Sequence, residues 1–443
     1  MSVDTGLQEL ERSNRPIRVG IVGAGATGRA IALHLGTPVP GMRLVGVANR
    51  SEANAERSLR EAGFTNWKHV DTSAQAGEQI VRGEVVVTTD PFVLTACDAV
   101  DVLVEVTGTV EAAANVVLDA IEHHKHIVLV NAELDSLVGP ILKAKADAAG
   151  VVITHTDGDE PGVAMTLLRY LRTLGLSVVA AGNIKGMVDY YRNPDTQKAF
   201  AEKHDQDVKK VTSFADSTKL SMEATVLSNA TGFHVGKRGM HGPACGYVRE
   251  VGNLLPAEQM LATGLVDYAL GAAPHTGAFA VVHEESPLKK TQLAYYKLGD
   301  GPFYVFYTPF HLPHLQIAST IGRVVVHKDP TVAPIGGPVC EVVSVAKRDL
   351  KAGERLDGIG GFCLYGLIDN SAEARAMDAL PIGLSDGCVL TRDVAKDEVV
   401  SFADVKEIAQ GTAWKLWQEQ KQRWQNADAR VANESQHVPV GVE

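Results

Sequence analysis

A short apolar run that leads directly into a glycine-rich turn constrains the fold of this chain more than any other feature. Residues 17–22 (IRVGIV) are rich in β-branched side chains, and residues 23–28 are GAGATG. This G-x-G-x-x-G pattern between a strand and a helix is typical of a dinucleotide-binding turn. The first glycine permits the tight turn, the second lets backbone approach a pyrophosphate, and the third lets helix pack on strand. We therefore predict that a helix N-terminus binds the cofactor phosphates, with contacts from Gly23, Gly25, Ala26, Thr27 and Gly28.

The first 155 residues alternate strand-like and helical patterns. Apolar residues recur at helical spacing between 110 and 121, and a segment at 140–149 opens with a proline, which favours a helix start. Strands buried on both faces that alternate with helices indicate an α/β fold, a doubly wound parallel sheet of the Rossmann type. The predicted strands are residues 17–22, 43–48, 101–107, 126–131 and 151–155.

Changes of pattern along the chain divide it into several units. Glycine- and histidine-rich loops and an aromatic run at 295–310 follow the first unit, and glycine pairs with short apolar runs follow residue 334. We expect the aromatic run to form core, with a lining of the substrate pocket as the alternative. Helices are expected at 161–174 and 403–424, and a strand at 339–346. The predicted units are an NADP-binding Rossmann domain at 1–156, an α+β catalytic domain at 157–333, a small β-rich unit at 334–425 and a mobile polar tail at 426–443.

Charge and composition exclude several classes of function. The net charge of −11 argues against a general nucleic-acid binder, which needs clustered lysine and arginine. No run of about 18 apolar residues is present, so no membrane span is expected. Five scattered cysteines suit reduced thiols in a cytoplasmic protein. We expect a small-molecule enzyme that forms a homo-oligomer, the default for this class.

The end of the second predicted strand indicates which nicotinamide cofactor is preferred. NAD-binding proteins place Asp or Glu there to bind the ribose 2′-hydroxyl, whereas this chain has Asn49, Arg50 and Ser51. No carboxylate here repels a 2′-phosphate, and the arginine and serine can bind one, so we predict NADPH as the cofactor. The alternative is that the arginine is a solvated residue of a surface loop. Later strand ends are expected to face the nicotinamide through Thr107, Gly108 and Asn131. Ordinary helix caps are an equal alternative for the threonine and the asparagine.

Three carboxylates follow the last strand of the first unit, at the edge of the sheet where ligands bind. Asp157, Asp159 and Glu160 offer the oxygen ligands that Mg²⁺ or Mn²⁺ prefers. The alternative is a solvated acidic turn that caps the next helix. His311 and His314 flank a Leu-Pro pair and are expected to be packed loop residues rather than metal ligands.

Four further side chains are candidates for proton transfer or for binding an oxyanion. Lys185 follows an apolar run, and Lys219 ends a segment of serine and threonine that suits a phosphate. His241 lies next to a basic pair, and Glu133 follows a strand end. For each cation alone, a solvated surface charge is an equally good interpretation.

Several segments resemble a known family. Residues 104–108 (VEVTG) resemble the homoserine dehydrogenase cofactor domain. Residues 157–162 (DGDEPG), 213–219 (SFADSTK), 239–243 (GMHGP) and 346–370 resemble homoserine dehydrogenase-like proteins with a C-terminal SAF domain, a family that includes 1-deoxy-D-xylulose 5-phosphate reductoisomerase-like proteins. The resemblance covers nearly the whole chain.

This resemblance implies an NADPH-dependent reductoisomerase that converts 1-deoxy-D-xylulose 5-phosphate to 2-C-methyl-D-erythritol 4-phosphate for isoprenoid synthesis. Homoserine dehydrogenases carry an Asn-Lys pair where this chain has Asn131-Ala132. Oxidation of another small hydroxy or keto substrate is the first alternative. A non-catalytic NADP(H)-binding sensor or assembly protein is the second.

Overall fold

The computed structural model describes residues 2–435, and of residues 425–435 the helical backbone alone. A seven-stranded sheet forms the N-terminal part, and all of its strands are parallel. The strand order is β3-β4-β2-β1-β5-β6-β7. The bounds are β1 (Ile17–Val22), β2 (Met42–Ala48), β3 (Lys68–His69), β4 (Val86–Thr88), β5 (Val102–Glu105), β6 (His126–Leu129) and β7 (Ile153–His155). The α/β fold class and all five predicted strands are confirmed.

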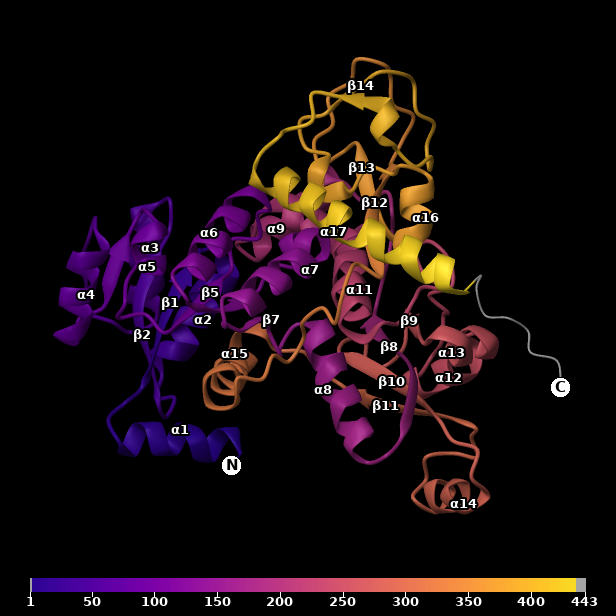
Figure 1. Cartoon of the computed structure of the whole chain (residues 1–443), viewed down its shortest axis with the longest axis horizontal. Helices are drawn as coiled ribbons and strands as arrows, with labels where there is room; N and C mark the ends of the chain where they lie inside the picture. The colour runs from indigo at the N-terminus through magenta and orange to yellow at the C-terminus, as the bar shows by residue number, and fades with distance from the viewer. Residues whose placement is uncertain (1, 436–443) are drawn as a thin grey trace.

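Helices connect these strands and cover the sheet (Figure 1). Because both faces are covered, the central strands are buried along nearly their whole length. The connecting helices are α2 (Ala26–Gly36), α3 (Glu52–Glu61), α4 (Ser73–Val81), α5 (Phe92–Thr95), α6 (Glu111–Glu122) and α7 (Ala132–Ala148), and α1 (Val3–Arg12) precedes β1.

The prediction that a helix begins at Pro140 is wrong, because that proline lies inside α7. The helix starts after Asn131, whose side chain accepts a hydrogen bond from the Leu134 N–H at 3.1 Å. The Gln420 side chain takes the place of the helical hydrogen bond between Ile141 and Leu137. Its amide nitrogen donates to the Leu137 carbonyl (3.0 Å), and its amide oxygen accepts from the Ile141 N–H (3.2 Å). These bonds satisfy the backbone groups that flank the proline, which is how a helix tolerates this residue in its interior.

A second, four-stranded sheet follows, in the order β11-β10-β8-β9. Strand β10 is antiparallel to both neighbours, and β8 and β9 are parallel. The strands are β8 (Ser177–Lys185), β9 (Leu265–Leu270), β10 (Ala278–His283) and β11 (Phe303–Thr308). The helices are α8 (Glu160–Thr173), α9 (Pro194–Lys203), α10 (Val208–Ala215), α11 (Thr218–Thr231), α12 (Val251–Leu254), α13 (Ala257–Thr263), α14 (Pro287–Tyr295) and α15 (Pro313–Gly322). Helix α11 is buried along nearly its whole length, and α15 returns to pack on α2.

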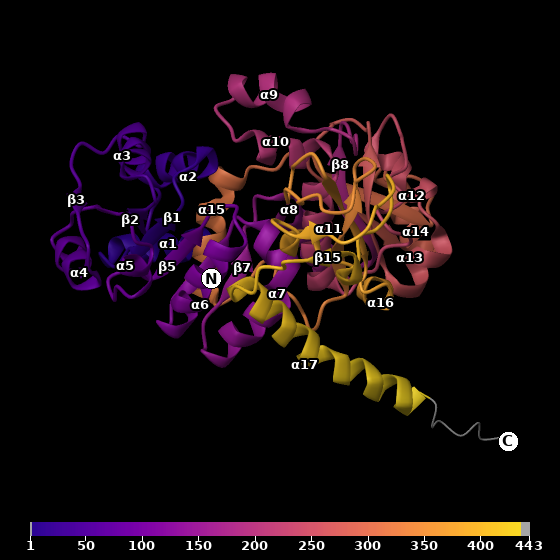
Figure 2. The same cartoon turned by 90° about the horizontal axis from the view of Figure 1, so that it is seen from above.

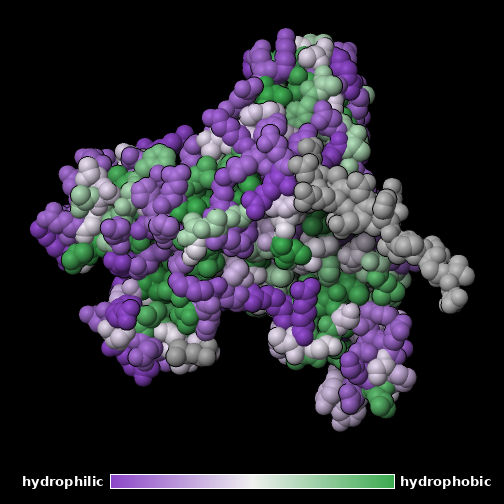
Figure 3. Space-filling model, in the orientation of Figure 1, coloured by the Kyte–Doolittle hydropathy of each residue, from purple (hydrophilic) through white to green (hydrophobic). Residues whose placement is uncertain are grey.

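The aromatic run expected to form core does so only in part. Tyr304 is fully buried, but Tyr295 and Tyr296 are 75% and 71% exposed and Phe310 is also exposed. The two exposed tyrosines lie at the end of α14, which projects from the body of the molecule (Figure 1). Figure 3 shows mainly polar residues over this face, with small apolar patches between them.

The C-terminal unit contains two antiparallel pairs, β12 (Cys340–Ala346) with β13 (Leu364–Asn370) and β14 (Val389–Leu390) with β15 (Val405–Lys406). It also holds α16 (Ser371–Ala376). The long helix α17 (Thr412–Ser435) lies along α7. The helix predicted at 403–424 therefore begins later, and the tail predicted at 426–443 starts as helix; residues 436–443 lie outside the described part. Within residues 2–435, none of the helices combines the length and apolar character needed to cross a membrane.

Candidate active site

A cavity of about 330 Å³ lies between the carboxyl edge of the parallel sheet and the second domain. The glycine-rich turn, two strand ends and helices α10 and α11 all contribute to it. The polar and small residues that line it are Thr27, Gly108, Glu133, Asp159, Glu160, Lys185, Lys210, Lys219, Glu223 and His311. Five of the residues predicted to be catalytic or metal-binding therefore meet here: Glu133, Asp159, Glu160, Lys185 and Lys219.

The glycine-rich turn has the geometry that a dinucleotide requires. Gly23 has φ +112°, and a Cβ on Gly28 would lie 2.1 Å from the Gly23 carbonyl oxygen, so only glycine fits at either place. A Cβ on Gly25 would meet nothing within 4 Å, which leaves that side open to a ligand. Helix α2 begins without a side-chain cap, so its first N–H groups are free for phosphate oxygens. The turn therefore fits a pyrophosphate.

The end of β2 is tied to this turn. Asn49 accepts a hydrogen bond from the Ala24 N–H at 3.1 Å and donates to the Ser51 carbonyl at 2.9 Å. Its side chain thus occupies the place where NAD-binding proteins usually carry a carboxylate. Arg50 beside it is exposed, and Ser51 caps α3.

Polar residues at the ends of β5 and β6 hold one another. Glu105 is fully buried and accepts hydrogen bonds from the Thr107 N–H (2.9 Å) and from Asn131 Nδ2 (2.7 Å). Burial raises the pKa of Glu105. Asn131 also caps α7, so the helix-cap interpretation is confirmed for the asparagine, and contact of either side chain with a nicotinamide stays a prediction.

Lys185 ends β8 and lies among carboxylates. Its Nζ is 2.5 Å from Glu160 Oε1 and 3.4 Å from Glu223 Oε2. Burial alone would lower the pKa of Lys185, but the charges of the two glutamates outweigh it and raise that pKa. Burial, with the charge of Glu160, raises the pKa of Glu223 to about 8. The site therefore combines a firmly charged ammonium with a carboxyl that exchanges its proton near neutral pH.

Lys219 approaches the same cavity from the first turn of α11. Its Nζ lies 3.6 Å from Glu133 Oε2 and 3.9 Å from Asp159 Oδ2. These carboxylates raise the pKa of Lys219 against the lowering effect of its burial. Lys219 and Glu223 are four residues apart on one helix and so share a face. The neighbouring Thr218 hydroxyl instead accepts from the Gly366 N–H, so it turns toward the C-terminal unit.

A fully buried histidine lies behind this cluster. His155 ends β7, and its ring donates to Asp135 Oδ2 (3.2 Å) and Asp159 Oδ2 (2.9 Å). Burial alone would lower the pKa of His155, but hydrogen bonds and charges from both aspartates raise it to about 9. The imidazolium fixes the Asp159 carboxylate, whose pKa is lowered mainly by Lys219 and His155 against the effect of burial.

Sequence reasoning missed four residues of this site, among them Lys210 on α10. His155 carried one usable signal, since it ends a predicted strand four residues before Asp159. Glu223 carried none, because it lies inside an almost wholly buried helix. His311 was expected to be a packed loop residue, but it lines the cavity, with Nε2 3.6 Å from Glu160 Oε2.

Two of the residues predicted to be catalytic or metal-binding lie apart from the cavity. Asp157 turns toward α15, where its Oδ2 accepts from Ser319 Oγ at 3.1 Å and lies 3.9 Å from Arg323. Residues 157–159 form a turn between β7 and α8, and this turn directs the two aspartates to different surroundings. His241 pairs with Gln259 at 2.8 Å and does not line the cavity.

Three carboxylates of the site could hold a divalent cation. Oxygens of Asp159, Glu160 and Glu223 all lie within 4.8 Å of one another. Hard oxygen donors suit Mg²⁺ or Mn²⁺. The donor set therefore fits such an ion, with Glu223 in the place predicted for Asp157 and with Lys185 against two of the three carboxylates.

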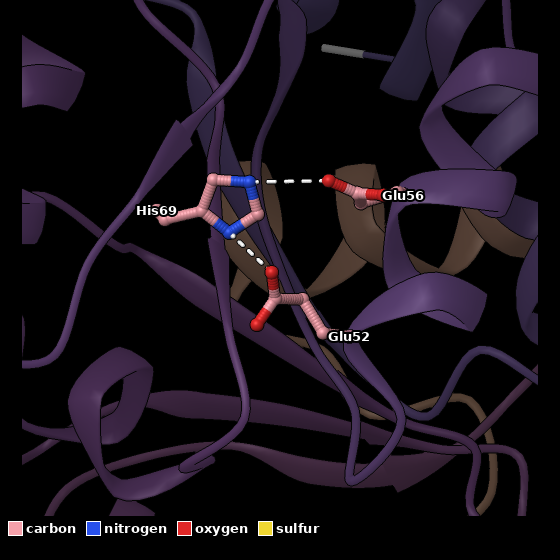
Figure 4. Close-up of side chains that lie close together, drawn as sticks. All are labelled: Glu52, Glu56 and His69. Carbon is pink, nitrogen blue, oxygen red and sulfur yellow. Dashed lines mark ion pairs between the residues drawn. The ribbon is translucent and has the colours of Figure 1, made fainter.

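A second cluster lies on the surface of the Rossmann domain. His69 is placed between Glu52 and Glu56, with its two ring nitrogens 3.2 Å and 3.1 Å from them (Figure 4). One ring nitrogen and one oxygen of each glutamate lie within 4.8 Å of one another. The cluster is apart from the cavity, and each ring nitrogen faces a different carboxylate.

Two family models each match one region of this chain. Residues 23–155 match the homoserine dehydrogenase NAD-binding domain, and residues 158–317 match the catalytic domain called oxidoreductase DRL. The SAF resemblance of residues 346–370 stays a prediction.

Individual relatives match a limited part of the chain. Homoserine dehydrogenase from Methylobacillus glycogenes is 28% identical over 30% of this chain and 30% of its own length. Homoserine dehydrogenase from Pseudomonas aeruginosa is 30% identical over 31% of this chain and 28% of its own. The chain thus matches less than a third of either relative.

Among solved structures, a probable dehydrogenase from Thermotoga maritima aligns over 72% of this chain and 91% of its own. Its TM-score is 0.42 and its identity 12%. The chain thus contains a region similar to the homoserine dehydrogenase NAD-binding domain, followed by a region similar to the oxidoreductase DRL catalytic domain.

Proposed function

We propose that this protein transfers a hydride between NADP(H) and a small hydroxy or keto substrate that binds in the 330 Å³ cavity. One observation carries the proposal. Two buried lysines, Lys185 and Lys219, face the cavity that the cofactor turn also borders, and each is paired with carboxylates. Dehydrogenases need such a combination, because the substrate oxygen gains or loses a proton as its carbon exchanges a hydride.

The proposed roles follow from these contacts. The bound cofactor supplies or accepts the hydride. A lysine ammonium donates a hydrogen bond to the substrate oxygen and stabilises the negative charge that develops there. Glu223, with its pKa raised to about 8, takes up or releases the proton near neutral pH. Asp159 is held by His155 and keeps Lys219 oriented toward the cavity.

The preference for NADPH rests on the end of β2. Asn49 is engaged with the glycine-rich turn, and Arg50 is exposed beside it. An arginine binds a 2′-phosphate through charge-assisted hydrogen bonds, and no carboxylate at this strand end repels one.

A second candidate is the reductoisomerase reaction on 1-deoxy-D-xylulose 5-phosphate. The observation that favours it is the carboxylate cluster of Asp159, Glu160 and Glu223. A divalent cation held there would bind neighbouring oxygens of a keto sugar and polarise its carbonyl. Lys185 and Lys219 would then stabilise the oxygens that gain charge.

The test is an assay of NADPH oxidation with deoxyxylulose phosphate, with and without Mn²⁺ or Mg²⁺, beside homoserine with NADP⁺. Metal-dependent NADPH consumption on the sugar phosphate establishes the second candidate. Turnover of homoserine without metal establishes a homoserine dehydrogenase-like oxidation. Cofactor binding without turnover on a broad panel of hydroxy and keto substrates contradicts both and favours a sensor.

A further inference from the structure

One lysine of the cavity has no counter-ion. Lys210 lies on α10, is half-buried and lines the cavity with Thr27 and Gly108. Its Nζ donates to the Thr107 carbonyl at 3.0 Å, and it forms no ion pair with any residue in the described part of the chain. Partial removal of a charged group from water without a counter-ion costs free energy. An anionic ligand that binds this ammonium would offset that cost.

The backbone opposite this lysine is built to receive it. Gly108 has φ +62°, and a Cβ there would lie 2.5 Å from the Lys210 Nζ and 2.8 Å from its Cε. Any larger residue would therefore push the ammonium out of its place. The close approach holds the charge at the edge of the parallel sheet, beside the start of α2.

A second contact holds α10 in position. The turn between α9 and α10 carries Asp205, whose carboxylate lies 2.8 Å from Arg29 and 3.1 Å from Arg57. Those arginines belong to α2 and α3, so the α9–α10 hairpin reaches from the second domain to the Rossmann domain (Figure 2). Lys210 is thus presented across the crevice between domains by a hairpin fixed at its tip.

The other two cavity lysines already form ion pairs with carboxylates. Lys185 is paired with Glu160 and Glu223, and Lys219 with Glu133 and Asp159. An anion that entered the cavity would have to break one of these pairs to bind either lysine. Lys210 alone among the three can accept an anion without that cost, and the positive end of α2 lies on the same cavity.

We propose that Lys210 binds a phosphate group in the cavity, with the N-terminus of α2 on the other side. This proposal rests on the proposed function, because it assigns the anionic partner of the same site. The phosphate belongs either to the dinucleotide or to a phosphorylated substrate. The experiment below distinguishes these two sources.

The experiment measures binding and not turnover, so it is independent of whether the correct substrate is known. NADPH and NADH are titrated into wild type, Lys210→Gln and Lys210→Arg, and inorganic phosphate is titrated into the enzyme–NADPH complex by calorimetry. Glutamine keeps a donor for the Thr107 carbonyl but lacks the charge, and arginine restores the charge. Lys209→Gln is the matched control, because that neighbouring lysine donates to the Asp357 carbonyl at 2.8 Å and lies outside the cavity.

If the phosphate belongs to the cofactor, Lys210→Gln lowers the affinities for NADPH and NADH alike by about tenfold to a hundredfold, and Lys210→Arg recovers most of that affinity. If it belongs to the substrate, both cofactors bind normally and the variant loses binding of inorganic phosphate to the NADPH complex. Either result supports the proposal. Cofactor and phosphate affinities in Lys210→Gln that match those of Lys209→Gln overturn it.

Discussion

The Nε2 atom of His155 lies 2.9 Å from Asp159 Oδ2; the histidine is fully buried, and the aspartate is buried except where it borders the cavity. The same ring reaches Asp135 through Nδ1 at 3.2 Å. A buried carboxylate of the active site is therefore fixed by a cation that never meets the substrate. The connection links β7 of the Rossmann sheet to the segment that opens α8.

This pair predicts a pH dependence of stability. Folding raises the pKa of His155 from 6.5 to about 9, so its stabilising effect is complete below pH 6.5 and is lost as the pH rises through 9. We expect the free energy of unfolding to fall by about 3 kcal/mol over this range from His155 alone. Urea unfolding at pH 6, 7.5 and 9 measures the change.

Glu223 acts in the same direction, because its raised pKa favours the protonated folded state at low pH. The contribution of the histidine is therefore taken as the difference between wild type and His155→Gln. That difference shrinks as the pH rises if His155 is cationic in the folded protein. A difference that is constant from pH 6 to pH 9 contradicts the prediction.

The two lysines of the cavity are expected to govern turnover and not cofactor affinity. Lys185→Met and Lys219→Met should each lower kcat by about 10²- to 10³-fold, the usual cost of removing one hydrogen-bond donor to a developing oxyanion. The dissociation constant of NADPH should stay within about twofold of the wild-type value, since neither lysine lines the glycine-rich turn. Lys143→Met is the control, because that lysine pairs with Asp147 on the same helix, outside the cavity. Unchanged kcat in both site variants would remove the lysines from the mechanism.

Arg50 is expected to set the preference between the two nicotinamide cofactors. Arg50→Gln should weaken the binding of NADPH by about tenfold and leave the binding of NADH unchanged, because only NADPH carries a 2′-phosphate. Fluorescence titration of both cofactors gives the ratio. Arg43→Gln serves as control, since Arg43 lies near the other end of β2 and pairs with Glu11. Equal weakening of the two cofactors would point to a general role of the arginine instead.

The C-terminal unit is expected to stabilise the active-site helix through one buried ion pair. Lys347 Nζ lies 2.8 Å from Asp216 Oδ2, and Asp216 in turn accepts from the Thr218 N–H at the start of α11. Lys347→Met leaves the buried aspartate without a counter-ion and should lower the free energy of unfolding by about 3 to 5 kcal/mol. Lys351→Met, which breaks an exposed pair with Asp393, should lower it far less, because solvent screens that pair. Urea unfolding of both variants makes the comparison, and equal losses would contradict it.

The sequence by itself determined the Rossmann half and the position of the cofactor turn. Its signals are local: β-branched runs bounded by turn residues, and glycines at Gly23 and Gly28 that the backbone geometry of the turn demands. Each of these features depends on near neighbours in the chain. Glu160 and Lys185, which follow predicted strands, both line the cavity, and their roles there stay predictions.

Tertiary structure alone decided the rest. Pro140 is favourable at a helix start, and only Gln420 of a helix far along the chain makes it acceptable inside α7. Asp157 and Asp159 look equivalent in sequence, but Asp157 bonds to α15 and Asp159 lines the cavity. Glu223 and Lys210 reach the site because helices from the second domain pack against the sheet edge. Such contacts join residues far apart in the chain, and their energies depend on burial and charge in the folded state, which no local pattern encodes.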